Sequence, residues 1–191
     1  MARLPMVSEQ PDDAALRAMY DEVRAQGIQI PNLYRVIGLA PPMLRAWLDF
    51  AWPLRQQAKT SRKIRELLIL RGAQVSATTY EWTHHHRMAL AAGVTQAQID
   101  ALALWQNSEL FNPQEKAVLR LAEEVTRGPA ASAACIEALK PHFSAAEIVE
   151  LTLTASFYVC VSRFLQSMEV DLEPGFVNTL PGKAQSEGDG R

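Results

Sequence analysis

Residues 61–93 have the pattern of two consecutive helices joined by a short polar turn, and this pair constrains the fold most. The segment reads SRKIRELLILRGAQVSATTYEWTHHHRMALAAG. Residues 64–75 are apolar on nearly every side of a helix, which is typical of a helix buried in the core. Glu66 nevertheless lies within this helix. Residues 78–92 predict a second helix, whose first turns carry a carboxylate and three consecutive histidines.

The second helix has one face that suits the wall of a pocket. Residues three and four positions apart are neighbours on a helix. Along this face the side chains are polar at the start and small and apolar at the end. The face consists of Thr78, Glu81, His85, Met88, Ala89 and Ala92.

The remaining sequence also has helical rather than strand patterning. No segment alternates apolar and polar residues for long, and no Asn-Gly or Asp-Gly hairpin signal occurs. The run TLTASFYVCV is the one candidate for a buried strand, but its length and the cap before it favour a helix. The sequence therefore predicts an all-α protein, with further helices near residues 12–26, 33–37, 41–53, 95–105, 112–127, 132–139 and 145–168.

Several of these helices have recognisable start and stop signals. Thr95 with Gln98 and Asn112 with Glu115 are capping-box pairs, and Ser144 with Glu147 is a third. Pro53 is expected to kink or end the helix that begins at Pro41.

The length of 191 residues suits one domain with a substantial core, or two small and tightly fused halves. We expect a flexible N-terminal arm over residues 1–11, a single all-α domain over 12–175 and a mobile tail over 176–191. The tail is predicted from its polar, glycine-containing and non-periodic sequence.

Composition and charge exclude some partners. The hydrophobic content of 48% and the charged content of 21% are ordinary for a soluble globular protein. The net charge is −2 and basic residues are scattered, so neither a nucleic-acid nor a membrane partner is expected. The N-terminus lacks the apolar core of a signal peptide, which favours a cytoplasmic location.

Two acidic residues and one histidine are the strongest candidates for chemistry. Glu66 must be paired, hydrogen-bonded or protonated if it is buried. An ion pair with Arg62, four residues earlier, is the structural alternative to a functional role. Glu81 and His85 are also four residues apart, so a carboxylate can orient the imidazole as a general acid or base.

No metal or cofactor is expected. Three consecutive helical histidines point about 100° apart and do not converge on one ion. Glu66, Glu81 and His85 together would supply two carboxylates and an imidazole, but no HExxH or CxxC spacing is present.

Other side chains are weaker candidates. Tyr158 and Arg163 lie in the last helix, where they would either orient a carboxylate-bearing ligand or tie helices together. Cys135 and Cys160 have apolar neighbours and are expected to be buried thiols rather than a disulfide.

The sequence resembles the carboxymuconolactone decarboxylase family, which includes the alkylhydroperoxidase D proteins. The specific segment is RKIRELLILRGAQVSATTYEWTHHHRMALAAGVTQAQI, and PNLYRVIGLAPPMLRAWLDF and FYVCVSRFLQSMEVDLE support it. The resemblance implies an all-α domain with a helical-repeat core that assembles as a homo-oligomer, either a dimer, a trimer or a hexamer.

In the peroxidase branch of that family, a glutamate is followed after about a dozen residues by Cys-x-x-Cys-x-x-x-His. Glu66 and His85 match the glutamate and the histidine, while Thr78 and Glu81 stand where the cysteines would be. Dithiol peroxide reduction then has neither a nucleophile nor a resolving thiol.

The resemblance therefore implies decarboxylase-like acid/base chemistry by Glu66, Glu81 and His85. The expected partner is a small carboxylated or lactone-like substrate. A peroxidase reaction through Cys160 alone and a non-catalytic ligand-binding protein remain alternatives. The predicted substrate-binding residues are Thr78, Tyr80, Trp82, Tyr158 and Arg163.

Overall fold

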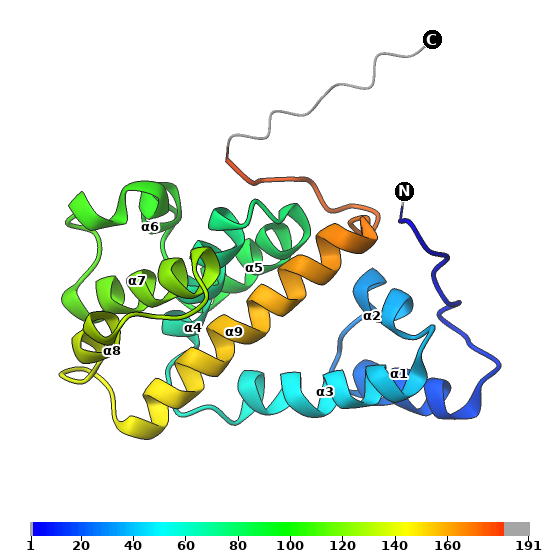
Figure 1. Ribbon diagram of the computed structural model, residues 1–191. Coiled ribbons are helices and arrows are strands. Elements are labelled where there is room, and N and C mark those ends of the chain that lie inside the picture. Colours follow the sequence, from blue (N-terminus) through cyan, green and yellow to red (C-terminus); the bar gives the residue numbers. More distant parts are fainter. Residues whose placement is uncertain (1, 182–191) are drawn as a thin grey trace, which may run out of the picture. The chain divides into compact units, whose positions relative to one another are not determined.

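The computed structural model describes residues 2–181, and no strand occurs among them, so the all-α prediction is confirmed. Figure 1 shows the helices in chain order. They are α1 (Ala14–Ala25), α2 (Asn32–Ile37), α3 (Pro41–Gln56), α4 (Arg62–Val75), α5 (Thr79–Ala91), α6 (Gln96–Ala101), the 3₁₀ helix η1 (Leu102–Asn107), α7 (Pro113–Arg127), α8 (Ala133–Leu139) and α9 (Ala145–Met168).

The predicted helix starts are confirmed where capping residues marked them. At α6 and α7 both halves of the capping box form, through Thr95 with Gln98 and through Asn112 with Glu115. At α9 the Ser144 hydroxyl accepts from the Glu147 amide at 3.3 Å. These bonds satisfy amide groups that have no partner inside the helix.

Two predicted boundaries were wrong. Helix α3 continues through Pro53 to Gln56, so it does not end at the proline, while a kink at Pro53 stays a prediction. Proline lacks an amide donor and crowds the carbonyl four residues earlier, but the Pro53 carbonyl still accepts from the Gln57 amide at 2.9 Å, so the last turn is kept. The predicted helix 95–105 is two elements, because α6 ends at Ala101 and a 3₁₀ helix follows from Leu102 to Asn107, with non-helical backbone angles at Leu104 inside it.

The chain forms two compact units, each built from segments that are distant in sequence. Among the described residues, unit 1 comprises residues 2–57 and 163–176, and unit 2 comprises residues 58–162 and 177–181. In unit 1, α3 packs against α1 and α2. In unit 2, α4 packs against α5 and α7, and α8 packs against α7. The single domain over residues 12–175 stays a prediction.

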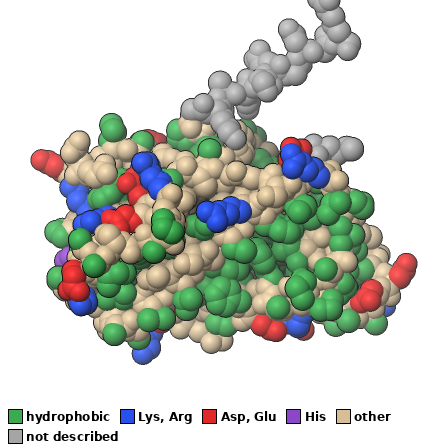
Figure 2. Space-filling model, viewed as in Figure 1, with side chains coloured by type: hydrophobic (Ala, Val, Ile, Leu, Met, Phe, Trp, Pro, Cys, Tyr) green, Lys and Arg blue, Asp and Glu red, His purple; other side chains and the backbone are tan. Residues whose placement is uncertain are grey.

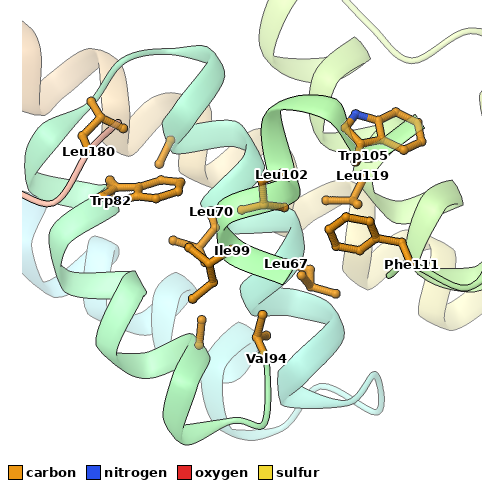
Figure 3. Close-up of a cluster of buried hydrophobic side chains, with 12 residues drawn as sticks. Leu67, Leu70, Trp82, Val94, Ile99, Leu102, Trp105, Phe111, Leu119 and Leu180 are labelled. Carbon is orange, nitrogen blue, oxygen red and sulfur yellow. The ribbon is translucent and has the colours of Figure 1, made fainter. Parts of the chain in front are cut away.

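A hydrophobic cluster in unit 2 combines side chains of α4 with side chains of α5, α6, η1 and α7 (Figure 3). Trp82 on α5, 1% exposed, packs in this cluster together with Leu180. Of the predicted mobile tail, only residues 176–181 are described, and there Leu180 is buried. Residues 182–191 of that prediction lie outside the described residues. The cluster consists of Leu67, Leu70, Ala73, Trp82, Ala89, Val94, Ile99, Leu102, Trp105, Phe111, Leu119 and Leu180.

The surface has mixed chemistry. On the face shown in Figure 2, acidic and basic side chains are scattered among hydrophobic ones and form no continuous patch of one sign. Helix α9 is the one described helix whose length and composition would suit a membrane span, and 44% of its most apolar window is buried inside the protein. A core helix has the same properties.

Candidate active site

Helices α4 and α5 are joined by a tight turn that fixes their relative position. Ala77 in this turn has a positive φ of 53°. The Thr78 amide donates to the Ala73 carbonyl at 3.0 Å, and the Ala77 amide donates to the Gln74 carbonyl at 3.2 Å. This is a left-handed helix cap, and it allows α5 to start two residues later.

Helix α4 presents Glu66 to His85 on α5. His85 Nδ1 lies 2.7 Å from Glu66 Oε2. Both side chains are buried, with 0% of the Glu66 side chain and 5% of the His85 side chain exposed. A carboxylate only accepts hydrogen bonds, so this contact places the hydrogen on Nδ1 and sets the tautomer and ring orientation.

Arg62 holds the other oxygen of the same carboxylate. It forms an ion pair with Glu66 Oε1, one helical turn along α4. The ion pair considered from the sequence therefore forms, and the Glu66–His85 contact forms as well. Glu66 is thus held by two groups at once, which compensates its burial.

These partners also set the acidity of Glu66. Burial would raise the pKa of the Glu66 carboxyl, but His85 and then Arg62 outweigh burial and hold that pKa below its ordinary value. Glu66 is therefore ionised at neutral pH, and a negative charge faces the imidazole.

Tyr158 on α9 contacts the imidazole from another side. Its ring centroid lies 4.9 Å from that of His85, and the two rings are perpendicular. Edge-to-face packing of this kind restricts how the imidazole can tilt. Of the substrate-binding residues predicted from the sequence, Tyr158 is thus placed directly beside the Glu66–His85 pair.

Glu81 takes part in a buried network of hydroxyl groups. Ser162 Oγ on α9 donates to Glu81 Oε2 at 2.7 Å. Ser76 Oγ lies 3.2 Å from Ser162 Oγ and 2.9 Å from Thr78 Oγ1. The carboxylate that bonds to His85 Nδ1 is therefore that of Glu66, and the predicted pairing of Glu81 with the imidazole stays a prediction.

A small cavity lies next to these groups. It measures about 10 Å³, which is room for about one water molecule. Tyr158 and Ser162 are among the residues that line it, so the cavity touches both the residue that packs on His85 and the residue that bonds to Glu81. The remaining lining residues are Leu68, Gly72, Ala122, Thr126, Ala155 and Val159.

Three other predicted substrate-binding residues have different environments. Tyr80 packs on His84, with ring centroids 4.5 Å apart. Trp82 lies in the hydrophobic cluster described above, and Arg163 is exposed and belongs to unit 1. Contact of any of them with a substrate stays a prediction.

The two cysteines and the potential metal-ligating side chains add no further group to the site among the described residues. Both cysteines are free, and Cys135 is buried as predicted. The prediction that Cys160 is buried was wrong, because Cys160 lies on a face of α9 that is exposed, as Ser156 and Arg163 also are. Burial raises the pKa of the Cys135 thiol to about 11, which keeps it protonated at neutral pH. Over residues 2–181, no group of three or more His, Cys, Asp or Glu side chains is arranged to hold a metal ion.

Sequence reasoning did not identify Ser76 and Ser162 as part of this site. Ser162 is 81 residues from Glu81, and a serine in an apolar helix gives no signal of its partner. The capping turn around Ala77 carries a weak signal for Ser76, since small polar residues favour such turns.

Part of the chain matches a known protein family. Residues 41–124, which include α4, α5 and the Glu66–His85 pair, match the Carboxymuconolactone decarboxylase family. Among curated proteins, the chain is similar to the uncharacterized protein YdfG of Bacillus subtilis (strain 168). The two are 26% identical over 117 residues, which cover 60% of this chain and 79% of YdfG.

Solved structures share the fold at low sequence identity. The alkylhydroperoxidase AhpD core of an uncharacterized peroxidase-related protein from Ralstonia eutropha JMP134 is 16% identical, with a TM-score of 0.78 over 91% of this chain and 93% of that one. The debrominase Bmp8 in complex with 2,3,4-tribromopyrrole is also 16% identical, with a TM-score of 0.73 over 91% and 95%. At this identity the likeness establishes the fold.

Proposed function

We propose that this chain, whose residues 41–124 match the carboxymuconolactone decarboxylase family, catalyses proton transfer to or from a small carboxylated or lactone-like organic molecule. The observation that carries the proposal is the buried contact of 2.7 Å between His85 Nδ1 and Glu66 Oε2. A carboxylate that fixes one ring nitrogen leaves the imidazole to exchange protons through the other.

The proposed roles follow from these positions. His85 is the general acid and base and acts through Nε2. Glu66 orients the ring and stabilises the imidazolium when it forms, because its negative charge is held 2.7 Å away. Glu81, held by Ser162, is proposed as a second carboxylate that faces the substrate.

Decarboxylation is the reaction that we favour. The bond between the carboxylate carbon and its neighbour breaks, carbon dioxide leaves, and the electron pair remains on the substrate as a dienolate. The His85 imidazolium then protonates that carbon through Nε2, and a proton from water restores the imidazolium. Acid/base assistance of this kind contributes roughly 10²- to 10⁴-fold in rate.

Dithiol peroxide reduction is disfavoured by the residues at the site. Thr78 and Glu81 stand where that chemistry would place two thiols, and neither supplies a sulfur nucleophile. The exposed Cys160 would have to react without a resolving partner close in sequence.

A panel of small lactone and unsaturated carboxylic acids tests the proposal, with release of carbon dioxide as the measured quantity. We expect His85→Gln to lower turnover by about 10²- to 10⁴-fold, since it removes the proton-transfer group. Glu66→Gln should lower turnover too, because the imidazolium loses its counter-charge.

His142→Gln is the matched control, because His142 is exposed and precedes α9 outside the site. Its turnover should equal that of the unchanged protein. Equal turnover in the His85→Gln and His142→Gln variants would refute the assignment. The far-ultraviolet circular dichroism of each variant shows whether the fold is kept.

A further inference from the structure

Helix α9 has an exposed side that carries no charge over most of its length (Figure 1). Its inner side is buried and carries Tyr158 and Ser162, which belong to the candidate site. From Leu151 to Ser162 the sequence contains no Asp, Glu, Lys or Arg. A helix without charges on any side is normally covered all round. The exposed side of α9 therefore suits a partner that is itself apolar.

The exposed residues form one stripe along α9. They are Val149, Leu153, Ser156 and Cys160, which follow one another in steps of four, three and four residues. Val149 is 57% exposed, Leu153 is 42% exposed, and Cys160 is exposed as well. Residues at these steps form the seam along which two helices pack in a coiled coil. The partner that fits this stripe is therefore another helix.

A second copy of the same helix offers a matching surface. A symmetric dimer uses one surface twice, so that surface must be complementary to itself. The stripe meets this condition when two copies run antiparallel, because Val149 then lies level with Cys160 and Leu153 lies level with Ser156 of the second copy. Residues 182–191, which lie outside the described residues, read GKAQSEGDGR and have no large apolar side chain to offer.

Charge favours the antiparallel direction. The first part of α9 carries Glu147 and Glu150, and Arg163 follows Cys160 on the exposed side. Parallel pairing would place like charges together at both ends of the stripe, which is unfavourable. Antiparallel pairing places the Arg163 end of one helix at the end of the other that carries the two glutamates. The ends of the stripe are thus complementary in this direction.

We propose that this chain forms a symmetric dimer in which the α9 stripes of two copies pack together antiparallel. Each copy then buries Val149 and Leu153 of the other, and the small Ser156 allows the two helices to approach closely. The second copy packs on the outer side of the helix whose inner side contacts His85 and Glu81. The dimer does not depend on the proposed reaction.

Disulfide cross-linking of the whole protein tests the register. Two cysteines form a disulfide when their Cα atoms lie within about 7 Å. Val149→Cys should cross-link two copies in oxidised glutathione, because its thiol lies level with Cys160 of the second copy. The unchanged protein should not cross-link through Cys160, since the two copies of this residue lie about 16 Å apart along the helix axes.

Two further variants separate this register from other contacts. Val149→Cys combined with Cys160→Ser should not cross-link, because its partner thiol is gone and the two positions 149 lie about 16 Å apart. Parallel pairing predicts the opposite result. Leu104→Cys reports random collision, because Leu104 is 71% exposed on η1, outside the stripe.

Sedimentation equilibrium measures association without a cross-link. One helix pair buries less than the about 800 Å² per partner of a standard interface, so we expect dissociation at micromolar concentrations. The average mass should rise from 21.2 kDa toward twice that value with concentration. Leu153→Glu should raise the dissociation constant about tenfold or more, since it places like charges in the seam. Leu104→Glu is the matched control and should leave it unchanged.

Three outcomes would overturn the proposal: a monomer at every concentration, equal cross-linking of Val149→Cys with and without Cys160, or equal dissociation constants for Leu153→Glu and Leu104→Glu. A monomer would leave the stripe to a different protein or to a lipid surface. The cross-linking variants keep the test valid if Leu153→Glu does not fold. None of these readouts requires turnover, so they are separate from the His85→Gln assay.

Discussion

At the scale of single residues, Glu66 is the most constrained side chain of the site. It is fully buried and contacts Arg62 through one oxygen and His85 through the other. An ionised carboxylate in such a place is stable only while both partners remain, because burying an unpaired charge is costly. Its protonation state should therefore influence stability as well as catalysis.

Stability at acid pH tests this role. The folded pKa of Glu66 lies below its ordinary value of 4.5, so the unfolded chain binds more protons between these two values. The contribution of Glu66 to stability is thus fully present above about pH 4.5 and is lost as pH falls through the folded pKa. We expect the free energy of unfolding of the unchanged protein to exceed that of Glu66→Gln near pH 6.

This difference should shrink steadily below about pH 4.5. Urea unfolding between pH 6 and pH 3 measures it. Glu137→Gln is the control, because Glu137 forms an exposed pair with Lys140 and its removal should have little effect at any pH. A difference between Glu66→Gln and the unchanged protein that does not vary with pH would contradict the expectation.

At the scale of elements, the turn between α4 and α5 decides whether Glu66 and His85 can meet. The turn closes through two backbone hydrogen bonds and a left-handed residue at Ala77. A side chain in that conformation costs roughly 1–2 kcal/mol, because its Cβ crowds the following carbonyl. The turn therefore contains local strain that glycine would relieve.

Ala77→Gly should raise the free energy of unfolding by about 0.5–1 kcal/mol. This net gain is the strain that glycine removes from the folded turn, minus the conformational entropy that glycine adds to the unfolded chain. Thermal and urea unfolding measure the change. Ala18→Gly, at an exposed position inside α1, should instead lower stability by about 1 kcal/mol. A loss of stability on Ala77→Gly would show that the left-handed conformation carries no strain.

At the scale of the whole molecule, each compact unit draws on both early and late parts of the chain. Unit 2 combines residues 58–162 with the segment that begins at residue 177. Within it, Leu180 packs in the same hydrophobic cluster as Trp82, and Trp82 lies on the helix that carries His85 (Figure 3). The late segment thus contributes to the packing behind the site.

Leu180→Ala should therefore lower the free energy of unfolding by about 2 kcal/mol, as expected for removing a buried leucine side chain. Val177→Ala is the control, because Val177 is 62% exposed and its change should stay within about 0.5 kcal/mol. Urea unfolding of both variants gives the comparison. Equal stabilities would mean that the late segment does not stabilise unit 2.

The sequence by itself determined the helices, because each depends on contacts three or four residues apart and on local caps. The all-α class, the buried α4 and the capping boxes at Thr95 and Asn112 were all predictable for this reason. The sequence also identified Glu66 and His85 as candidates, since a carboxylate in an apolar helix needs a partner.

Only the tertiary structure decided which partners these residues have. Glu66 and His85 are 19 residues apart, and Glu81 and Ser162 are 81 residues apart. Helical periodicity specifies which side chains share a face, but not which face of another helix packs against it. That choice depends on the packing of whole helices, and it pairs His85 Nδ1 with Glu66 and Glu81 with Ser162.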